Sequence, residues 1–336
     1  MRLESTKRGA CAIAQRRRLD QRPPPAPSSE SLSASDPSTA DRGRPRSQRG
    51  FTLIELVAAV LIGSVMAATL VVFFKPAVDG YLASRSRADL TAQAATALRR
   101  ITRDVRIAVP NSIRTPGSQC FELLPSSGGG RYRTGPDTVN DSAPGCSPGS
   151  ACAAALDPAQ AVTSFDVLTP FASLPSVGDW VVVGNQTPAE AYAGSNRAAI
   201  TDVGTPTASQ GRHRLAVTSL QVPPGYDGAR FTLVSNTQRA VFYVCSGADG
   251  TLDAQGNGKG TLYRLQNYGF NAAYPSACPS TTGADVLATQ LRSCSFVYDP
   301  IQGATQQNGF VWIELDLAQR GEAAHLAMGA HVANAP

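Results

Sequence analysis

A long apolar run with one acid just before it dominates the first third of the chain. Residues 56–74 include no charged side chain, and these nineteen residues would extend about 28 Å as a helix. That length is close to the roughly 30 Å hydrocarbon core of a bilayer, so the run predicts a membrane-spanning helix. Glu55 directly precedes it. An unpaired carboxylate inside a membrane costs about 2.5 to 3.5 kcal/mol, so this acid needs a partner.

A second helical pattern follows the apolar run. Pro76 is expected to bend or locally break the helix, because proline has no backbone donor and clashes with the preceding turn. The helix then resumes with an amphipathic half that ends near Pro110 and Asn111. We therefore predict one helix over 51–109, membrane-spanning at 51–74. Its apolar stripe recurs at steps of three and four: Leu90, Ala94, Ala97, Leu98, Ile101 and Val105.

The rest of the chain has the pattern of β-structure. Residues 110–160 are rich in Gly, Pro and Ser and are predicted to be loop. Residues 161–336 are predicted to form an antiparallel β domain, in which alternating apolar positions indicate one packed and one wet face. The predicted fold is α+β, with the long helix packed on an antiparallel β-sheet stapled by disulfides. The predicted strands are 164–168, 180–183, 198–203, 214–220, 231–234, 240–245, 261–265, 293–298 and 310–317.

Positive charge is concentrated before the apolar run. Residues 1–50 contain eleven Lys or Arg against five acids, or +6, while the whole chain carries +5. The remainder is therefore −1 (5 − 6), which gives no reason to expect nucleic acid as a partner. Basic residues next to a span stay in the cytoplasm, so everything after the span lies across the membrane. Residues 21–36 are rich in Pro and Ser, and residues 1–50 are predicted to be a basic, disordered leader.

Six of the seven cysteines follow the leader, and Cys11 lies within it. An even number in an oxidising compartment indicates three disulfides, although six cysteines permit about fifteen pairings. We expect two of the first three to tie the glycine-rich loop and two of the last three to tie the late strands. Zinc is disfavoured, because no two cysteines have the two-residue gap of zinc knuckles. The six candidates are Cys120, Cys146, Cys152, Cys245, Cys278 and Cys294.

No pattern of catalytic residues stands out, so no enzyme activity, cofactor or metal is predicted. His213, His325 and His331 are the only histidines, and no Ser or Cys lies in a nucleophile motif. Residues 249–257 place oxygen ligands alternately, as a calcium loop does. Ala254, however, stands where the sharp turn requires Gly, and no Glu closes the ring, so a hairpin turn is favoured.

The boundary between the basic leader and the apolar run carries the most specific motif. Cleavage after Gly50 would give Phe51 a free α-amino group, which could pair with Glu55 of a neighbouring copy of the helix. Gly50, Phe51, Thr52, Leu53 and Glu55 match the motif G-F-T-L-x-E without a gap and resemble the type IV prepilin family. An uncleaved anchor and an ordinary secretory signal are the alternatives. The latter requires a small-residue cleavage site after its apolar region, not before it.

The resemblance implies several roles and partners. Gly50 and Phe51 would flank the cut made by a prepilin peptidase, which would also methylate the Phe51 amine. Glu55, Thr52 and Leu53 would guide subunit assembly. Other minor pilins, the major pilin and the inner-membrane assembly platform would be partners. The chain would cross the bacterial inner membrane once, with its C-terminal domain in the periplasm or in the pilus.

Size and further segments narrow the resemblance. After cleavage 286 residues would remain (336 − 50), more than a major pilin usually has. Residues 75–81, 96–106, 109–114 and 334–336 are similar to minor pilins of mannose-sensitive haemagglutinin (MSHA) pilus biogenesis. The resemblance therefore implies a minor pilin that takes part in initiating pilus assembly. A minor pseudopilin of a type II secretion system and an adhesive or DNA-uptake minor pilin remain the alternatives.

Overall fold

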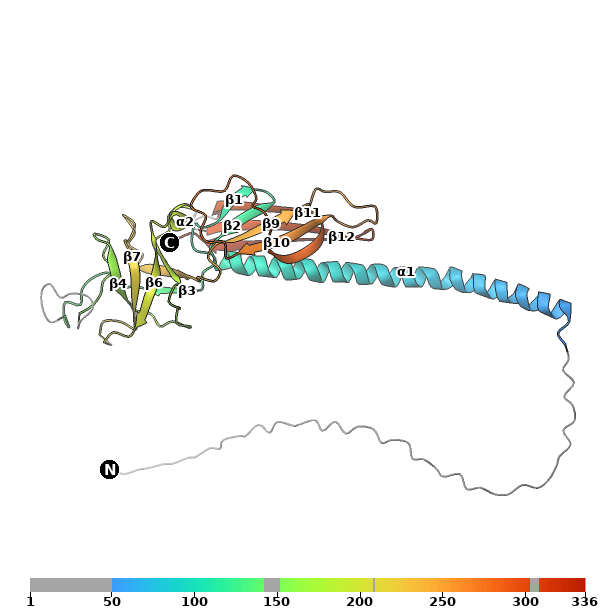
Figure 1. Cartoon of the computed structure of the whole chain (residues 1–336), viewed down its shortest axis with the longest axis horizontal. Coiled ribbons are helices and arrows are strands. Elements are labelled where there is room, and N and C mark those ends of the chain that lie inside the picture. Colours follow the sequence, from blue (N-terminus) through green and yellow to red (C-terminus); the bar gives the residue numbers. More distant parts are fainter. Residues whose placement is uncertain (1–49, 142–151, 208, 303–307, 336) are drawn as a thin grey trace, which may run out of the picture. The chain divides into compact units, whose positions relative to one another are not determined.

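The computed structural model describes residues 50–141, 152–207, 209–302 and 308–335. Its first element is a single helix, α1 (Leu53–Arg106), of 54 residues (Figure 1). The predicted local break at Pro76 is wrong, because α1 continues as a helix through that residue. Pro76 removes only one backbone donor, and the turns on either side keep the helix in register. The predicted leader, apart from Gly50, lies outside the described residues.

Seven antiparallel strands form the sheet on which α1 packs. Their order is β1-β2-β9-β10-β11-β12-β13. This arrangement confirms the predicted α+β class. The bounds are β1 (Arg114–Gly117), β2 (Cys120–Leu123), β9 (Val241–Ser246), β10 (Gly260–Gln266), β11 (Asp285–Gln302), β12 (Asn308–Gln319) and β13 (Glu322–Ala333).

The core of this unit lies between α1 and one face of the sheet. All six residues of the predicted helical stripe are buried there, from Leu90 to Val105. They meet the alternating apolar side chains of β12, of which Val311, Ile313 and Leu315 are at most 1% exposed. Burial of such side chains is worth about 1.5 to 3 kcal/mol each, so this contact fixes the helix on the sheet.

A second sheet of six strands closes on itself, which the sequence did not predict. Its order is β3-β8-β5-β6-β7-β4. The two end strands meet: Leu168 N–H donates to Arg131 O (2.8 Å), and Arg133 N–H donates to Asp166 O (2.9 Å). The sheet therefore closes into a barrel through this short bridge. Its strands are β3 (Gly128–Arg131), β4 (Val162–Val167), β5 (Trp180–Val183), β6 (Arg197–Gly204), β7 (His213–Leu220) and β8 (Arg230–Val234).

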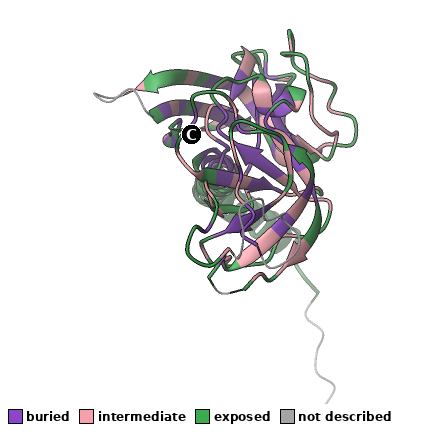
Figure 2. Cartoon of the chain, turned by 90° about the vertical axis from the view of Figure 1, so that its left-hand side faces the viewer, coloured by how far each residue is buried: buried purple, intermediate pink, exposed green. Residues whose placement is uncertain are grey.

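The barrel has a core of its own. Phe165, Val181, Leu215 and Phe231 are among the buried side chains that fill it, and Phe165 packs edge-on against Phe231. Figure 2 shows buried positions along the strands, while the connecting loops are largely exposed or intermediate. The short helix α2 (Glu190–Ala193) follows β5. The predicted single β domain thus contributes to more than one apolar core.

Residues 110–160 differ from the prediction of loop. They contain β1, β2 and β3, of which β1 and β2 begin the large sheet and β3 closes the barrel. Each has only four residues, and β3 reads Gly-Gly-Gly-Arg, so no alternation of apolar residues revealed it. The sequence also missed β13, whose many alanines have low β-propensity. Pairing with a neighbouring strand overrides these weak local preferences.

A buried charged cluster joins α1 to the sheet. Asp104 is only 5% exposed, and its Oδ2 accepts hydrogen bonds from Arg264 Nη2 (2.9 Å), Arg264 Nε (3.1 Å) and the Tyr243 hydroxyl (2.7 Å). Burial, with the negative charge of Asp104 as a second cause, raises the pKa of Tyr243 above its usual range. The hydroxyl therefore stays protonated and continues to donate to the carboxylate.

A second buried cluster joins the large sheet to the barrel. Arg114 and Glu122 are both fully buried and 3.3 Å apart, and the guanidinium lies 3.2 Å from the ring centroid of Tyr192 in α2. Two backbone carbonyls, of Ala273 and Asn271, accept from the same guanidinium. Burial raises the pKa of Glu122 to about 7.

Asparagine side chains complete this junction. Asn111 Nδ2 donates to the carbonyls of Asn185 and Asn334 (2.9 Å each), and Asn185 Nδ2 donates to Pro110 O (2.7 Å). Asn334 Nδ2 donates in turn to the Tyr298 hydroxyl (3.0 Å). The segment after α1, the barrel and the C-terminal end of the chain are therefore held together by directional hydrogen bonds.

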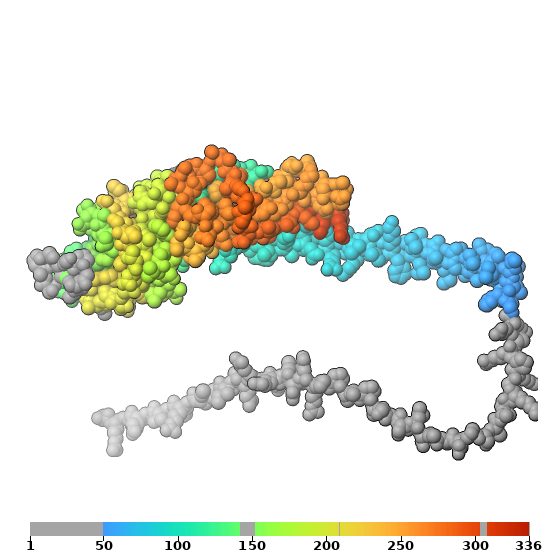
Figure 3. Space-filling view, viewed as in Figure 1, coloured from blue at the N-terminus to red at the C-terminus, as the bar shows by residue number. Residues whose placement is uncertain are grey.

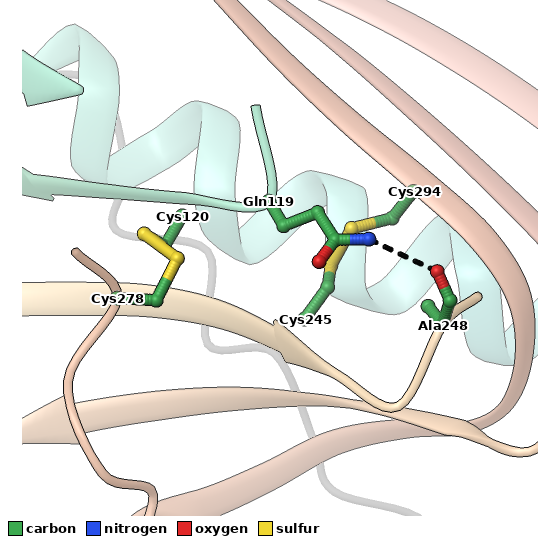
Figure 4. The surroundings of a disulfide bond; sticks show 6 residues. All are labelled: Gln119, Cys120, Cys245, Ala248, Cys278 and Cys294. Atoms are coloured by element: carbon green, nitrogen blue, oxygen red, sulfur yellow. Dashed lines mark hydrogen bonds between the residues drawn. A yellow bond between two sulfur atoms is a disulfide. The ribbon is translucent and has the colours of Figure 1, made fainter. Parts of the chain in front are cut away.

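Two disulfides reinforce the large sheet (Figure 4). Cys245 on β9 pairs with Cys294 on β11, and Cys120 on β2 pairs with Cys278 in the long loop after β10. The first joins two late strands, and the second spans 158 residues of sequence. Cys152 is buried and disulfide-bonded. Cys146 lies outside the described residues.

Replacement of Asp104 by Ala should destabilise the chain strongly. The change leaves Arg264 buried without its carboxylate, and breaking a buried pair costs about 3 to 5 kcal/mol. Asp89→Ala is the matched control on the same helix, because the Arg85–Asp89 pair is largely exposed. It should change stability by less than about 0.5 kcal/mol. Urea denaturation of the two full-length variants in detergent measures the difference, and equal losses would contradict the assigned role of Asp104.

Removal of the Cys245–Cys294 disulfide should also cost stability. Its cysteines are 49 residues apart, and the chain-entropy relation gives about 4 kcal/mol for a loop of that length. The double variant Cys245→Ser/Cys294→Ser avoids a free thiol and should melt well below the native protein. Val297→Thr, an exposed change on the same strand, should leave the melting temperature nearly unchanged. Equal melting temperatures for both variants would show that the Cys245–Cys294 disulfide adds little to the stability of the fold.

Candidate functional site

The motif found in the sequence lies at the start of α1. Gly50 and Phe51 precede the helix, which begins at Leu53, and the first helical hydrogen bond runs from Leu56 N–H to Thr52 O (3.2 Å). Thr52 is therefore the N-cap residue. Phe51 is 82% exposed, and a Cβ added to Gly50 would meet no atom within 4 Å. The Gly50–Phe51 peptide bond is thus accessible to an enzyme.

Thr52 and Glu55 form a reciprocal pair that caps α1. Glu55 N–H donates to Thr52 Oγ1 (3.3 Å), while Thr52 N–H and Thr52 Oγ1–H both approach Glu55 Oε2 (3.3 and 3.4 Å). This is the capping box, in which a Thr at the N-cap and a Glu three residues later satisfy two otherwise unpaired donors. The negative charge also lies at the positive end of the helix dipole.

The capping box holds only half of the Glu55 carboxylate. Among the described residues no donor reaches Oε1, and the side chain is exposed. The hydrogen bonds to Oε2 are long, and no cation of the described chain pairs with it. The carboxylate therefore caps the helix through one oxygen and has acceptor capacity left over. An amine brought by another chain could bind to it without displacing the cap.

The first half of α1 exposes an almost continuous apolar surface. Large side chains from Leu53 to Phe74 are 46 to 82% exposed, and the most apolar window of α1 has no buried residue. Figure 3 shows this part of α1, in blue, as a bare rod of side chains. An apolar surface of this size requires lipid or other apolar helices around it. By length and composition α1 is the one helix of the described chain that could cross a membrane.

The other candidates of the sequence analysis form no site. His325 and His331 are exposed on β13, and His213 stacks on Phe171 in the barrel. Residues 249–257 lie in the connection between β9 and β10, a hairpin as predicted. Within the described ranges no three His, Cys, Asp or Glu side chains are grouped so as to hold a metal ion.

Sequence reasoning missed one feature of the site and one feature of the fold. The Thr-x-x-Glu spacing is itself the signature of a capping box, so the local role of Glu55 could have been predicted. The segments at 109–114 and 334–336, noted only for their resemblance, meet in space: Asn111 N–H donates to Asn334 Oδ1 (3.2 Å). No sequence pattern could have paired residues so far apart.

Comparison with known proteins supports the N-terminal motif. The family model of the prokaryotic N-terminal methylation motif matches residues 45–71, which covers the leader end, the capping box and most of the apolar run. No curated protein and no solved structure gives a significant match. The motif supports a type IV pilin-like protein that is processed by a prepilin peptidase and acts in the context of pilus assembly.

Proposed function

We propose that this chain is a minor type IV pilin that helps to initiate pilus assembly, similar to MshO of the MSHA pilus. A prepilin peptidase would cut after Gly50 and methylate Phe51, and α1 would hold the chain in the inner membrane with residues 77–336 in the periplasm. One observation carries the proposal. The methylation motif, with the exposed carboxylate of Glu55, lies at the start of α1. The first half of this helix is apolar and exposed, and the second half buries one face on a sheet.

The geometry of Glu55 supports a role between subunits. After cleavage the Phe51 amine of one chain would carry a positive charge in an apolar surrounding, where an unpaired charge is costly. Glu55 of a neighbouring chain offers an exposed carboxylate, of which only one oxygen takes part in the cap. Pairing would remove the cost of the unpaired amine and that of the unpaired carboxylate at once. It therefore favours parallel packing of α1 helices with a stagger of about one turn. Leu53 would pack among those helices.

The size and the second core of the chain support a minor subunit. A shaft subunit must be repeated many times in close packing, whereas this chain would retain 286 residues after cleavage (336 − 50) and carries a closed barrel beyond the large sheet. Such a bulky addition is better suited to a few copies at or near the tip. The residual charge of −1 gives no support for DNA uptake.

Gly50→Leu should leave the leader attached. The added side chain meets nothing in the structure, so the variant should fold normally and fail only in the peptidase site. Gly63→Leu is the control, because a Cβ there is equally unobstructed and lies inside α1. Immunoblots of cells with and without the peptidase would measure the length. The proposal fails if the unmodified chain has the same mobility in both strains.

Glu55→Gln should separate the charge of Glu55 from its capping role. Gln also serves in a capping box, so the helix start is preserved while the negative charge is lost. The variant should be cut and membrane-bound, but its recovery in sheared pili should fall about tenfold or more, equivalent to at least about 1.4 kcal/mol. Thr52→Ser keeps both the cap and the charge and should be recovered normally. Normal recovery of Glu55→Gln would refute pairing between subunits.

A further inference from the structure

The last turns of α1 are strongly basic. Residues 99–106 contain four arginines and one acid, whereas the chain after Gly50 carries −1 overall (5 − 6). The acid, Asp104, is already compensated, because its Oδ2 accepts hydrogen bonds from Arg264 and from the Tyr243 hydroxyl. The arginines therefore leave an excess of positive charge at this end of the helix.

A hollow of about 250 Å³ lies beside these arginines. Three separate parts of the chain line it: the end of α1, residues 125–127 before β3, and the turn between β8 and β9. A single water needs only about 10 to 15 Å³ of such volume, so the hollow has room for a small ligand. Its polar lining residues include Arg100, Arg103, Asp104, Ser126, Ser127 and Gln238.

Several donors around this hollow find no acceptor in the chain. Arg103 makes no hydrogen bond or ion pair with any described residue. Arg100 Nε is buried without a hydrogen-bond partner, and its distance to Asp104 Oδ1 is 3.6 Å. The Ser127 hydroxyl and the Gln238 side-chain amide also bind no group within the described ranges. Charged and neutral donors are thus available together in one place.

The charge and the donors together select an anion. Arginine presents N–H donors in a planar fork that binds carboxylate and phosphate oxygens. A cation is disfavoured, because Asp104 is the only acid in the described lining and Arg264 already pairs with it. The donors belong to three segments around the hollow and do not follow a single element. This arrangement suits a tetrahedral oxyanion better than a planar carboxylate.

The position of the hollow restricts the source of the anion. Arg100 lies 26 residues after Phe74 (100 − 74), which is about 39 Å along the helix, so a lipid headgroup at the end of the apolar run could not reach it. Residues 142–151, 208 and 303–307, which the structure does not describe, contain no Asp or Glu. Neither a membrane at that level nor these segments supply the anion, and a small dissolved oxyanion needs no partner protein.

We propose that this hollow binds a small tetrahedral oxyanion of the phosphate or sulfate type, with Arg100 and Arg103 as its cationic contacts. Ser127 and Gln238 would donate to its other oxygens. A bound anion would link the end of α1 to the turn that joins the barrel to the large sheet, so it would stabilise the folded chain. The proposal is independent of the proposed function, because it involves neither Gly50 nor Glu55.

Equilibrium dialysis of the full-length chain in detergent against radiolabelled inorganic phosphate tests this site. The ionic strength is held at about 0.1 M with sodium chloride, where charges more than about 10 Å apart are largely screened. We expect saturable binding of one phosphate per chain, in competition with sulfate. Arg103→Gln should raise Kd about tenfold, which corresponds to about 1.4 kcal/mol. Arg103 is exposed, so this variant should melt like the native chain when phosphate is absent.

Arg106→Gln is the matched control. Basic residues in the last turn of a helix also compensate its dipole, and this variant removes the same charge from the same turn but outside the hollow. It should leave Kd nearly unchanged, whereas Ser127→Ala should weaken binding without any change of charge. The proposal is overturned if the native chain shows no saturable phosphate binding, if Arg106→Gln weakens binding as much as Arg103→Gln, or if succinate, a dicarboxylate, binds more tightly than phosphate.

Discussion

One continuous helix must satisfy two different surroundings, and the rest of the structure depends on this constraint. The stripe from Leu90 to Val105 is buried on the seven-stranded sheet, while the large side chains from Leu53 to Phe74 have no cover within the described chain. The sheet therefore stabilises only the second half of α1. The first half requires an apolar partner from outside, either lipid or other helices. Asp104 and its partners Arg264 and Tyr243 fix the point where the helix is held.

Glu55 at the start of α1 has a role within its own chain, as a helix cap, and a proposed role between chains, as a partner for an amine. The capping box satisfies backbone donors of the helix and at the same time holds one oxygen of Glu55. A charge that would be costly in an apolar surrounding is thereby partly compensated within the single chain. The free oxygen leaves room for a second, stronger compensation by an amine. Such a carboxylate is compatible with the proposed subunit, which would first be anchored in a membrane and then join an assembly.

Much of this arrangement could be predicted where the sequence pattern is long and regular. The periodic stripe of α1 and the alternation of β12 gave the helix-on-sheet core, and the contiguous motif at Gly50–Glu55 gave the candidate site. Closure of the barrel was not predictable, because it depends on four-residue strands such as β3, whose glycines carry no pattern. The junction of Asn111 with Asn334 depends on a tertiary contact that no local rule describes.

The intact mass and N-terminal residue of the chain recovered from bacterial membranes test the central claim most directly. The account predicts a protein that lacks residues 1–50, begins at Phe51 and carries one methyl group on its α-amine. A membrane-bound chain with the leader still attached, in cells that contain an active prepilin peptidase, would contradict it. So would a mature chain beginning after the apolar run, because α1 would then have lost the segment that we propose to mediate assembly.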